Sequence, residues 1–242
     1  MKIAVIGGTG LIGSQVVTKL KAAGHQAVPH SKSTGVDIIS GLGLEEAVAG
    51  ADVVVNLTNS PTFDEASPAF FQTSMDNLLA AAQKARVGHF VILSIVGTDK
   101  VPALDYYRAK ALQEDILVAG PIPYSIVRAT QFMEFMDAVI SWTADSDVVR
   151  LPATPIQPIA SKDVADAVAE VAAGAPLLGI RNIAGPEIFS LDELGRITLA
   201  HQGDKRTVVT DPTAGMFAVV EGDVLTDKDA HLAPTLYTDW LS

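Results

Sequence analysis

The sequence predicts an α/β fold in which helices wind both faces of a parallel sheet, and three observations predict it. The chain opens on a short apolar strand, Lys2 to Ile6, that runs directly into glycines. Apolar residues then recur every four positions at Ile12, Val16 and Leu20, so the period changes from strand to helix. Strand and helix patterns alternate further along, and β-branched runs such as Val53 to Leu57 are typical of central parallel strands covered on both faces.

The first turn, Gly7-Gly8-Thr9-Gly10-Leu11-Ile12-Gly13, has GxxGxxG spacing between that strand and that helix. A tight turn after a strand needs a residue free to adopt positive φ, and a phosphate approaches the backbone only where no Cβ intervenes. An ordinary strand-to-helix turn is the alternative. The context favours a Rossmann-type dinucleotide site in which the helix dipole faces a pyrophosphate. The expected cofactor-binding residues of this turn are Gly7, Thr9, Gly10, Leu11, Ile12 and Gly13.

Composition narrows the class of protein. The 242 residues are 48% hydrophobic, and 17 Lys and Arg against 28 Asp and Glu give a net charge of -11, which argues against general nucleic-acid binding. The absence of cysteine excludes disulfides and thiolate metal sites. The N-terminus lacks a basic region and a cleavage site, and no stretch has the length of a membrane span. We expect a soluble, cytoplasmic protein that does not bind a membrane.

The second strand, His25 to Pro29, bears on cofactor selectivity. NAD-selective sites carry a carboxylate at its tip, about 20 residues beyond the glycines. This chain instead has His30, Ser31, Lys32 and Ser33, and such donors suit a 2′-phosphate. The pattern predicts NADP(H) in preference to NAD(H), with Ser31 and Lys32 as binding residues, although a solvated turn is the alternative. Asp37 is placed to accept a hydrogen bond from the adenine amino group, or to serve a structural role at a strand end.

Polar residues follow the third strand, Val53 to Leu57. Open α/β sheets bind ligands at the carboxyl ends of their strands, so we expect Thr58, Asn59 and Ser60 to approach the cofactor, with Thr58 and Ser60 as binding residues. A long helix is predicted from Ser67 to Arg86, with Ser67 as its N-cap.

Three residues of the next segment form the candidate catalytic set. Ser94 stands at the end of a buried strand, Phe90 to Leu93. Tyr106 and Lys110 are four apart at the start of a helix that reaches Ala119, so they share one face. A phenol is a poor proton donor near neutrality unless a nearby cation stabilises its phenolate, and Lys110 supplies such a cation. Ser94 would then bind the substrate oxygen while Tyr106 protonates it.

Each of these residues has a simpler interpretation as well. Ser94 as a strand cap, a packing tyrosine and a solvated lysine are all common. Tyr107 competes with Tyr106, because only one of two adjacent helical residues shares a face with Lys110. Their joint spacing, together with the glycine turn, favours catalysis.

The sequence resembles the short-chain dehydrogenase/reductase superfamily, and in particular its atypical, NmrA-like branch. The resemblance covers most of the chain and rests on the glycine turn, Ser94, Tyr106 with Lys110, and the stretch Pro123-Tyr124-Ser125-Ile126-Val127-Arg128-Ala129-Thr130. It implies that the serine, tyrosine and lysine are catalytic. Family members commonly have proline after the arginine of that stretch, where this chain has Ala129.

The second half of the chain offers fewer signals. An apolar segment that includes Phe132, Met136 and Trp142 is expected to form helical core and to wall a pocket for an apolar or aromatic substrate. Helices are expected from Lys162 to Ala173 and after a capping box at Ser190. We expect residues 1–242 to form a single NAD(P)-binding domain in which residues 130–242 are a small part that covers the substrate.

The favoured function is an NADPH-dependent reductase that transfers hydride to a small carbonyl, quinone or related electrophile by a Ser-Tyr-Lys mechanism, with Lys110 also holding the nicotinamide ribose. The alternative is a non-catalytic NADP(H)-sensing regulatory protein of NmrA type. A sugar-nucleotide epimerase is a weaker third possibility, because such enzymes are usually longer. The sequence leaves the substrate and the oligomeric state open.

Overall fold

The computed structural model describes all 242 residues, which group into two compact units. Unit 1 comprises Met1–Arg128 and Val164–Arg181, and unit 2 comprises Ala129–Asp163 and Asn182–Ser242. Both units are therefore assembled from segments that are distant in the sequence. The residues expected to cover a substrate, 130–242, fall in unit 2 except for residues 164–181.

The central sheet has seven strands in the order β12-β9-β5-β4-β3-β1-β2. Neighbours β1–β2, β1–β3, β3–β4 and β9–β12 pair in parallel. This topology confirms the predicted Rossmann-type α/β fold. The strands are β1 (Lys2–Ile6), β2 (Gln26–His30), β3 (Val53–Asn56), β4 (His89–Ile95), β5 (Tyr124–Ala129), β9 (Gly179–Ala184) and β12 (His231–Leu232).

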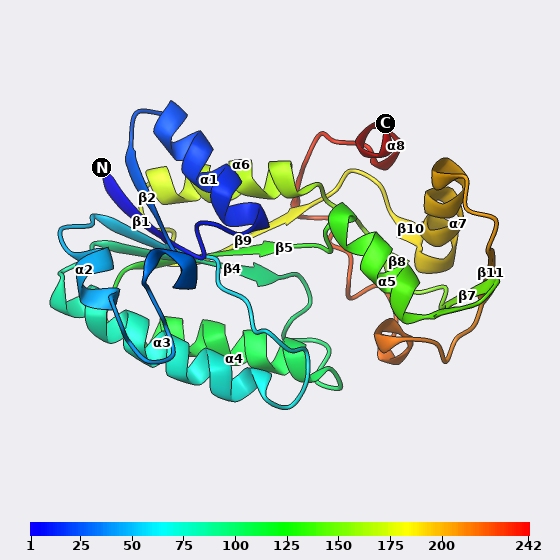
Figure 1. The fold of residues 1–242 in the computed structure, drawn as a ribbon, viewed down its shortest axis with the longest axis horizontal. Helices are drawn as coiled ribbons and strands as arrows, with labels where there is room; N and C mark the ends of the chain where they lie inside the picture. Colours follow the sequence, from blue (N-terminus) through cyan, green and yellow to red (C-terminus); the bar gives the residue numbers. More distant parts are fainter. The chain divides into compact units, whose positions relative to one another are not determined.

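Helices cover both faces of this sheet (Figure 1). On one face α3 (Ser67–Lys84) and α4 (Asp105–Ala119) run side by side, with the short α2 (Leu44–Val48) beyond them. On the other face lie α1 (Leu11–Ala22) and α6 (Ser161–Ala173), which are joined by a 2.5 Å ion pair between Lys19 and Asp166. The sheet is thus doubly wound.

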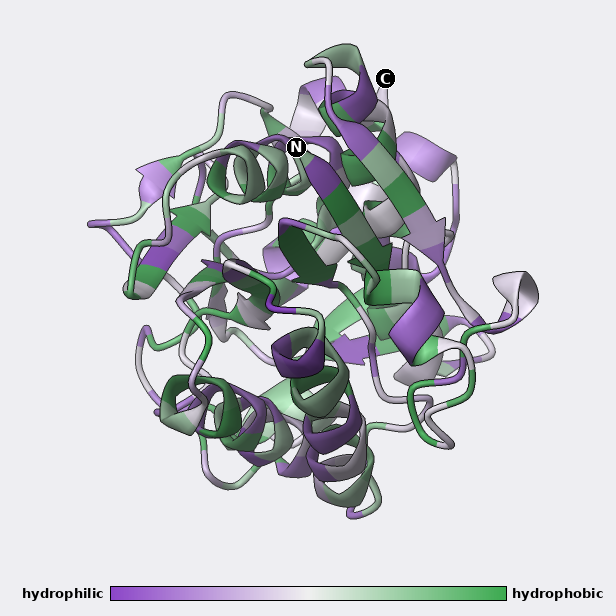
Figure 2. Cartoon of the chain, turned by 90° about the vertical axis from the view of Figure 1, so that its left-hand side faces the viewer, coloured by the Kyte–Doolittle hydropathy of each residue, from purple (hydrophilic) through white to green (hydrophobic).

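One layer of the core of unit 1 lies between the sheet and the helices α2, α3 and α4. It is built from β-branched strand residues such as Val54 and Ile92 and from the inward face of α3, with Met75 and Leu78 fully buried. Hydrophilic and hydrophobic residues alternate along the helices in Figure 2, as expected for helices that bury one face. No helix of the chain combines the length and the hydrophobicity needed to cross a bilayer.

Unit 2 holds two small sheets of its own. Strands β6 (Ala144–Asp145), β7 (Val148–Leu151) and β11 (Thr207–Thr210) form one, and β8 (Pro155–Ile156) pairs with β10 (Phe189–Ser190) in the other. Tyr237 is fully buried, and its hydroxyl lies 2.7 Å from that of Thr198. The helical elements are η2 (Met133–Phe135), α5 (Met136–Trp142), α7 (Leu191–Gln202), η3 (Met216–Val219) and α8 (Tyr237–Leu241).

Two expected helix caps differ from the structure. Ser67 is the first residue of α3 rather than its N-cap, and its hydroxyl donates to the Thr62 carbonyl at 2.7 Å. Ser190 does occupy the N-cap of α7, but its side chain makes no capping bond. The predicted capping box is absent because the Glu193 carboxylate pairs instead with Arg196, at 3.3 Å.

Candidate functional site

The candidate site lies where the order of the strands reverses. The chain leaves β1 for β2 on one side and later returns to add β3 on the other. Ile6, the last residue of β1, is in register with both His30 and Asn56. The carboxyl ends of these three strands therefore meet at a topological switch point, which is where open α/β sheets bind ligands.

The glycine turn fills this position and needs its glycines. Gly7 has φ +78°, and its amide donates to the His30 carbonyl at 2.8 Å. A Cβ on Gly13 would lie 2.1 Å from the carbonyl oxygen of Gly7, so α1 packs directly on the turn. These two positions accept no larger residue without a shift of the backbone.

The start of α1 is free for an anion. Gly10 is its N-cap, no side chain caps the helix, and its first turn carries no acidic residue. Thr9 and Leu11 are exposed, whereas the side chain of Ile12 is buried and leaves only its backbone for a ligand. The residues present therefore fit a pyrophosphate at the positive end of the helix dipole.

The tip of β2 brings Lys32 and Asp37 together. The ammonium of Lys32 lies 3.7 Å from the Asp37 carboxylate, and the other carboxylate oxygen accepts the Ile39 amide at 2.9 Å. The Ile39 bond and then Lys32 lower the pKa of Asp37. The Ser31 hydroxyl lies 2.8 Å from that of Ser33 in the same turn.

His30 is the residue of this cluster that sequence reasoning did not single out. Its Nε2 is buried and has no hydrogen-bond partner. Burial, and secondarily the charge of Lys2, lower the pKa of His30, so the neutral ring is favoured. An unpartnered polar atom at a cofactor edge is a signal of a ligand contact, and only the packed structure reveals it.

Some polar side chains of the loop after β3 make hydrogen bonds that hold the loop and α3 in place, and one contacts the candidate catalytic residue Tyr106. Thr58 donates its amide and its hydroxyl to Asn56 Oδ1, at 3.1 and 2.7 Å. Ser60 is buried, and its hydroxyl lies 3.1 Å from that of Ser67, so it braces the start of α3. Asn59 is exposed and faces α4, where its Oδ1 accepts the hydroxyl of Tyr106.

Ser94 lies within β4 at the same edge. Asn56 is in register with Ile92, and two residues further along each strand stand Thr58 and Ser94. Ser94 is 3% exposed, and its Oγ has no hydrogen-bond partner. A buried hydroxyl without a partner is suited to a ligand oxygen.

Tyr106 and Lys110 share a neighbour on α3. The ring of Tyr106 lies 6.3 Å from that of Phe71, and the ammonium of Lys110 lies 4.9 Å from the same Phe71 centroid. Tyr106 also packs edge-on against Phe63 at 4.7 Å. Tyr107, the rival candidate, is buried, and its carbonyl accepts the Thr98 hydroxyl at 3.0 Å.

Burial dominates the electrostatics of this pair. It raises the pKa of Tyr106 well above the usual range. It lowers the pKa of Lys110 to about 7, against the charge of Glu114. The ammonium donates to the Leu93 carbonyl at 2.7 Å and to Gln113 Oε1. Tyr106 is therefore a protonated phenol at neutral pH, and Lys110 titrates near neutrality.

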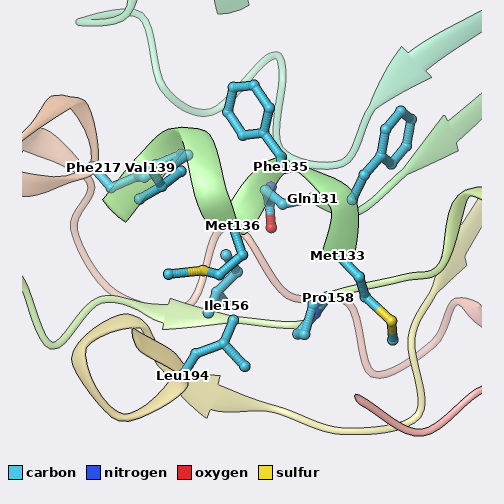
Figure 3. A pocket seen from close by; sticks show the side chains of 10 residues that line it. Gln131, Met133, Phe135, Met136, Val139, Ile156, Pro158, Leu194 and Phe217 are labelled. Carbon is cyan, nitrogen blue, oxygen red and sulfur yellow. The ribbon is translucent and has the colours of Figure 1, made fainter. Parts of the chain in front are cut away.

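The apolar segment that follows β5 lies in unit 2 and lines a pocket there. Side chains from η2, α5, β8 and α7 converge on it, and Met136, Ile156 and Leu194 point toward one another in Figure 3. Trp142 does not line this pocket and packs edge-on against Phe135 at 5.1 Å. The full lining is Gln131, Phe132, Met133, Phe135, Met136, Val139, Ile156, Pro158, Leu194 and Phe217.

The sheet topology, the glycine turn and the open start of α1 together define a dinucleotide-binding protein of Rossmann type. A model of the NAD(P)H-binding family matches residues 7–174. The chain belongs to this family, which is the NmrA-like group within the short-chain dehydrogenase/reductase superfamily.

Relatives of known structure share the fold at low identity. One is a short-chain dehydrogenase/reductase superfamily protein from Agrobacterium tumefaciens with bound NAD, with TM-score 0.70, 17% identity and coverage of 87% of this chain and 85% of that one. Another is triphenylmethane reductase from Citrobacter sp. complexed with NADP(H), with TM-score 0.68, 20% identity and coverage of 87% and 79%.

A curated relative is the photosystem II assembly factor Ycf39 of Synechocystis sp., 27% identical over 151 residues. The match covers 55% of this chain and 46% of that protein, so it spans less than half of the relative's length.

Proposed function

We propose that this chain is an NADPH-dependent reductase that transfers hydride to a small carbonyl, quinone or related electrophile. The observation that carries the proposal is the packing of Tyr106 and Lys110 against the same Phe71 ring, on the helix that follows Ser94. A proton donor, a cation and an unpartnered hydroxyl belong to one unit with a turn that fits a pyrophosphate.

The chain's residues divide the chemistry as follows. NADPH, when bound, supplies the hydride that reduces the substrate carbon. Ser94 Oγ donates a hydrogen bond to the substrate oxygen and orients it. Tyr106 transfers its hydroxyl proton to that oxygen, so the carbonyl becomes an alcohol and the tyrosine a phenolate. Lys110 stabilises the phenolate and holds the nicotinamide ribose, and its charge matters most at this step.

Residues at the start of α1 and at the tip of β2 hold the cofactor in this proposal. The backbone amides of Leu11 and Ile12, which open α1 within the turn from Gly7 to Gly13, bind the pyrophosphate, and Thr58 approaches it from β3. Ser31 and Lys32 bind the 2′-phosphate and favour NADP(H) over NAD(H), while Asp37 accepts the adenine amino group. Ser60 supports the site by bracing α3 through Ser67, at 3.1 Å. The apolar pocket of unit 2 supports an apolar or aromatic substrate.

A non-catalytic NADP(H) sensor is the second candidate. It is favoured by the similarity to Ycf39, a photosystem II assembly factor. In that case the nucleotide would regulate the binding of a protein partner, and Tyr106 and Lys110 would only hold the cofactor.

One experiment separates the two functions. The purified chain is titrated with NADPH and with NADH by nicotinamide fluorescence, and a panel of quinones and aldehydes is then added. Tighter NADPH binding followed by oxidation on adding an acceptor supports the reductase. Binding without oxidation across the panel rejects the reductase in favour of the sensor. Failure to bind either nucleotide contradicts both.

A further inference from the structure

Lys110 contacts a buried polar cluster whose members come from β3, α3 and α4. Helices α3 and α4 run side by side on one face of the sheet (Figure 1). Gln113 and Met75 are fully buried, and Asn56 is 1% exposed. Amide side chains are costly to bury in an apolar core unless their hydrogen bonds are satisfied. The bonds that these amides make therefore indicate why the core retains them.

Both amides donate to one sulfur atom. Gln113 Nε2 lies 3.8 Å and Asn56 Nδ2 lies 3.5 Å from Met75 Sδ. A thioether sulfur only accepts hydrogen bonds, so each amide must turn its nitrogen toward Met75 and its oxygen away. The oxygen of Gln113 then accepts the ammonium of Lys110, and the oxygen of Asn56 accepts Thr58.

This arrangement fixes the ammonium of Lys110. An ammonium has three donors, and here one is used on the Leu93 carbonyl and one on Gln113 Oε1. The Phe71 ring lies 4.9 Å from the nitrogen. One donor is left for a ligand, and its direction is set by the two bonds already made.

We propose that Gln113 is a positioning residue that holds the ammonium of Lys110 for the cofactor and for Tyr106, and that Met75 fixes the orientation of the Gln113 amide. This role rests on the proposed reductase function. It adds two residues that do not react themselves. Gln113 contacts Lys110 directly, and Met75 contacts Gln113.

The charged groups near Lys110 also affect its protonation. On α4, Glu114 stands one turn after Lys110, and Tyr106 stands one turn before it. The Glu114 carboxylate is held by Arg128 of β5 at 2.6 Å, and Arg128 also reaches Asp99 at 3.1 Å. Strand β4 contributes a carbonyl and α3 a phenyl ring. Gln113 is therefore the neutral side-chain acceptor that, together with the Leu93 carbonyl, favours the charged form of Lys110.

The test follows the titration of Lys110 in the full chain labelled with ¹³C at the lysine ε-carbon, with the signal assigned by its loss in Lys110→Met. Gln113→Glu places a carboxylate on the ammonium and should raise the midpoint by about one to three pH units. Gln113→Met removes the acceptor and should lower it. Met75→Leu frees the amide to turn its nitrogen toward Lys110 and should lower it as well. Gln83→Glu, the same change at an exposed position of α3, should not move it.

The pH profile of NADPH oxidation should move with the midpoint in each variant. A Lys110 midpoint that stays at its wild-type value in Gln113→Glu would overturn the proposal. If Gln113→Glu does not fold, an unchanged midpoint in Gln113→Met and Met75→Leu would overturn it. If the midpoints shift in the variants but the wild-type protein fails to oxidise NADPH with any acceptor of the panel, the reductase function is rejected while the positioning of Lys110 stands.

Discussion

The hydroxyl of Tyr106 donates a hydrogen bond to the side-chain oxygen of Asn59, 47 residues earlier in the chain. The bond joins α4 to the loop after β3, so it connects the candidate proton donor with the cofactor edge. Burial raises the pKa of this phenol. Asn59 therefore positions the hydroxyl of Tyr106.

Replacing Asn59 with alanine should slow turnover by about fivefold, because the loss of one hydrogen bond of about 1 kcal/mol leaves the phenol less well held. Asn59→Asp should slow it further, since a carboxylate opposes formation of the phenolate. The pH dependence of kcat and the Kd for NADPH measure this. Thr62→Ala in the same loop is the control, and an unchanged profile in both Asn59 variants would contradict the assignment.

Tyr106→Phe should reduce turnover at least 10²-fold while NADPH affinity stays nearly unchanged, because only the proton donor is removed. Tyr107→Phe is the matched control, since that side chain is buried on another face of the helix. Steady-state kinetics with fluorescence titration decide between them. Full activity in Tyr106→Phe would rule out its role as acid.

Lys110 should make stability depend on pH. Its folded-state pKa of about 7 lies below its ordinary value of 10.5, so the unfolded chain binds more protons between these values. The free energy of unfolding of the wild type should therefore rise with pH in this window relative to Lys110→Met, with a slope of up to about 1.4 kcal/mol per pH unit. Below pH 7 the difference should be constant. Urea unfolding from pH 6 to 9 measures it, with the exposed Lys84→Met as control.

Lys32→Ala should weaken NADPH binding by about tenfold and leave NADH binding unchanged, because only NADPH carries a 2′-phosphate. Asp37→Asn should strengthen NADPH binding, since it releases Lys32 from a carboxylate 3.7 Å away. Both effects should shrink at high salt. Equal losses for the two nucleotides in Lys32→Ala would show that this lysine does not set selectivity.

Gly13→Ala should abolish binding of either nucleotide, because the added Cβ would lie 2.1 Å from the Gly7 carbonyl oxygen and force α1 away from the turn. Gly88→Ala is the control, since its nearest neighbour would be at an ordinary 3.7 Å. Circular dichroism and fluorescence titration distinguish loss of the site from loss of the fold. Normal binding by Gly13→Ala would refute the close packing of α1 on the turn.

The main strands and helices of unit 1 can be predicted from the amino-acid sequence alone. The glycine turn, the β-branched run of β3 and the helix that carries Tyr106 and Lys110 are local patterns, and all lie where periodicity placed them. Such patterns are readable because backbone conformation and the burial of one face are encoded within a few neighbouring residues. The order of the strands in the sheet, and with it the switch point beside β1, comes from the tertiary structure.

Which side chains contact one another depends on the tertiary structure. Tyr106 forms a hydrogen bond with Asn59, Gln113 forms one with Met75, and the Ser60 hydroxyl lies beside that of Ser67. These partners are far apart in sequence or have several acceptors within reach, and packing selects among them. The pKa values depend on the tertiary structure in the same way. Desolvation raises the pKa of Tyr106 and lowers that of Lys110, and it depends on all the surrounding elements and on no single motif.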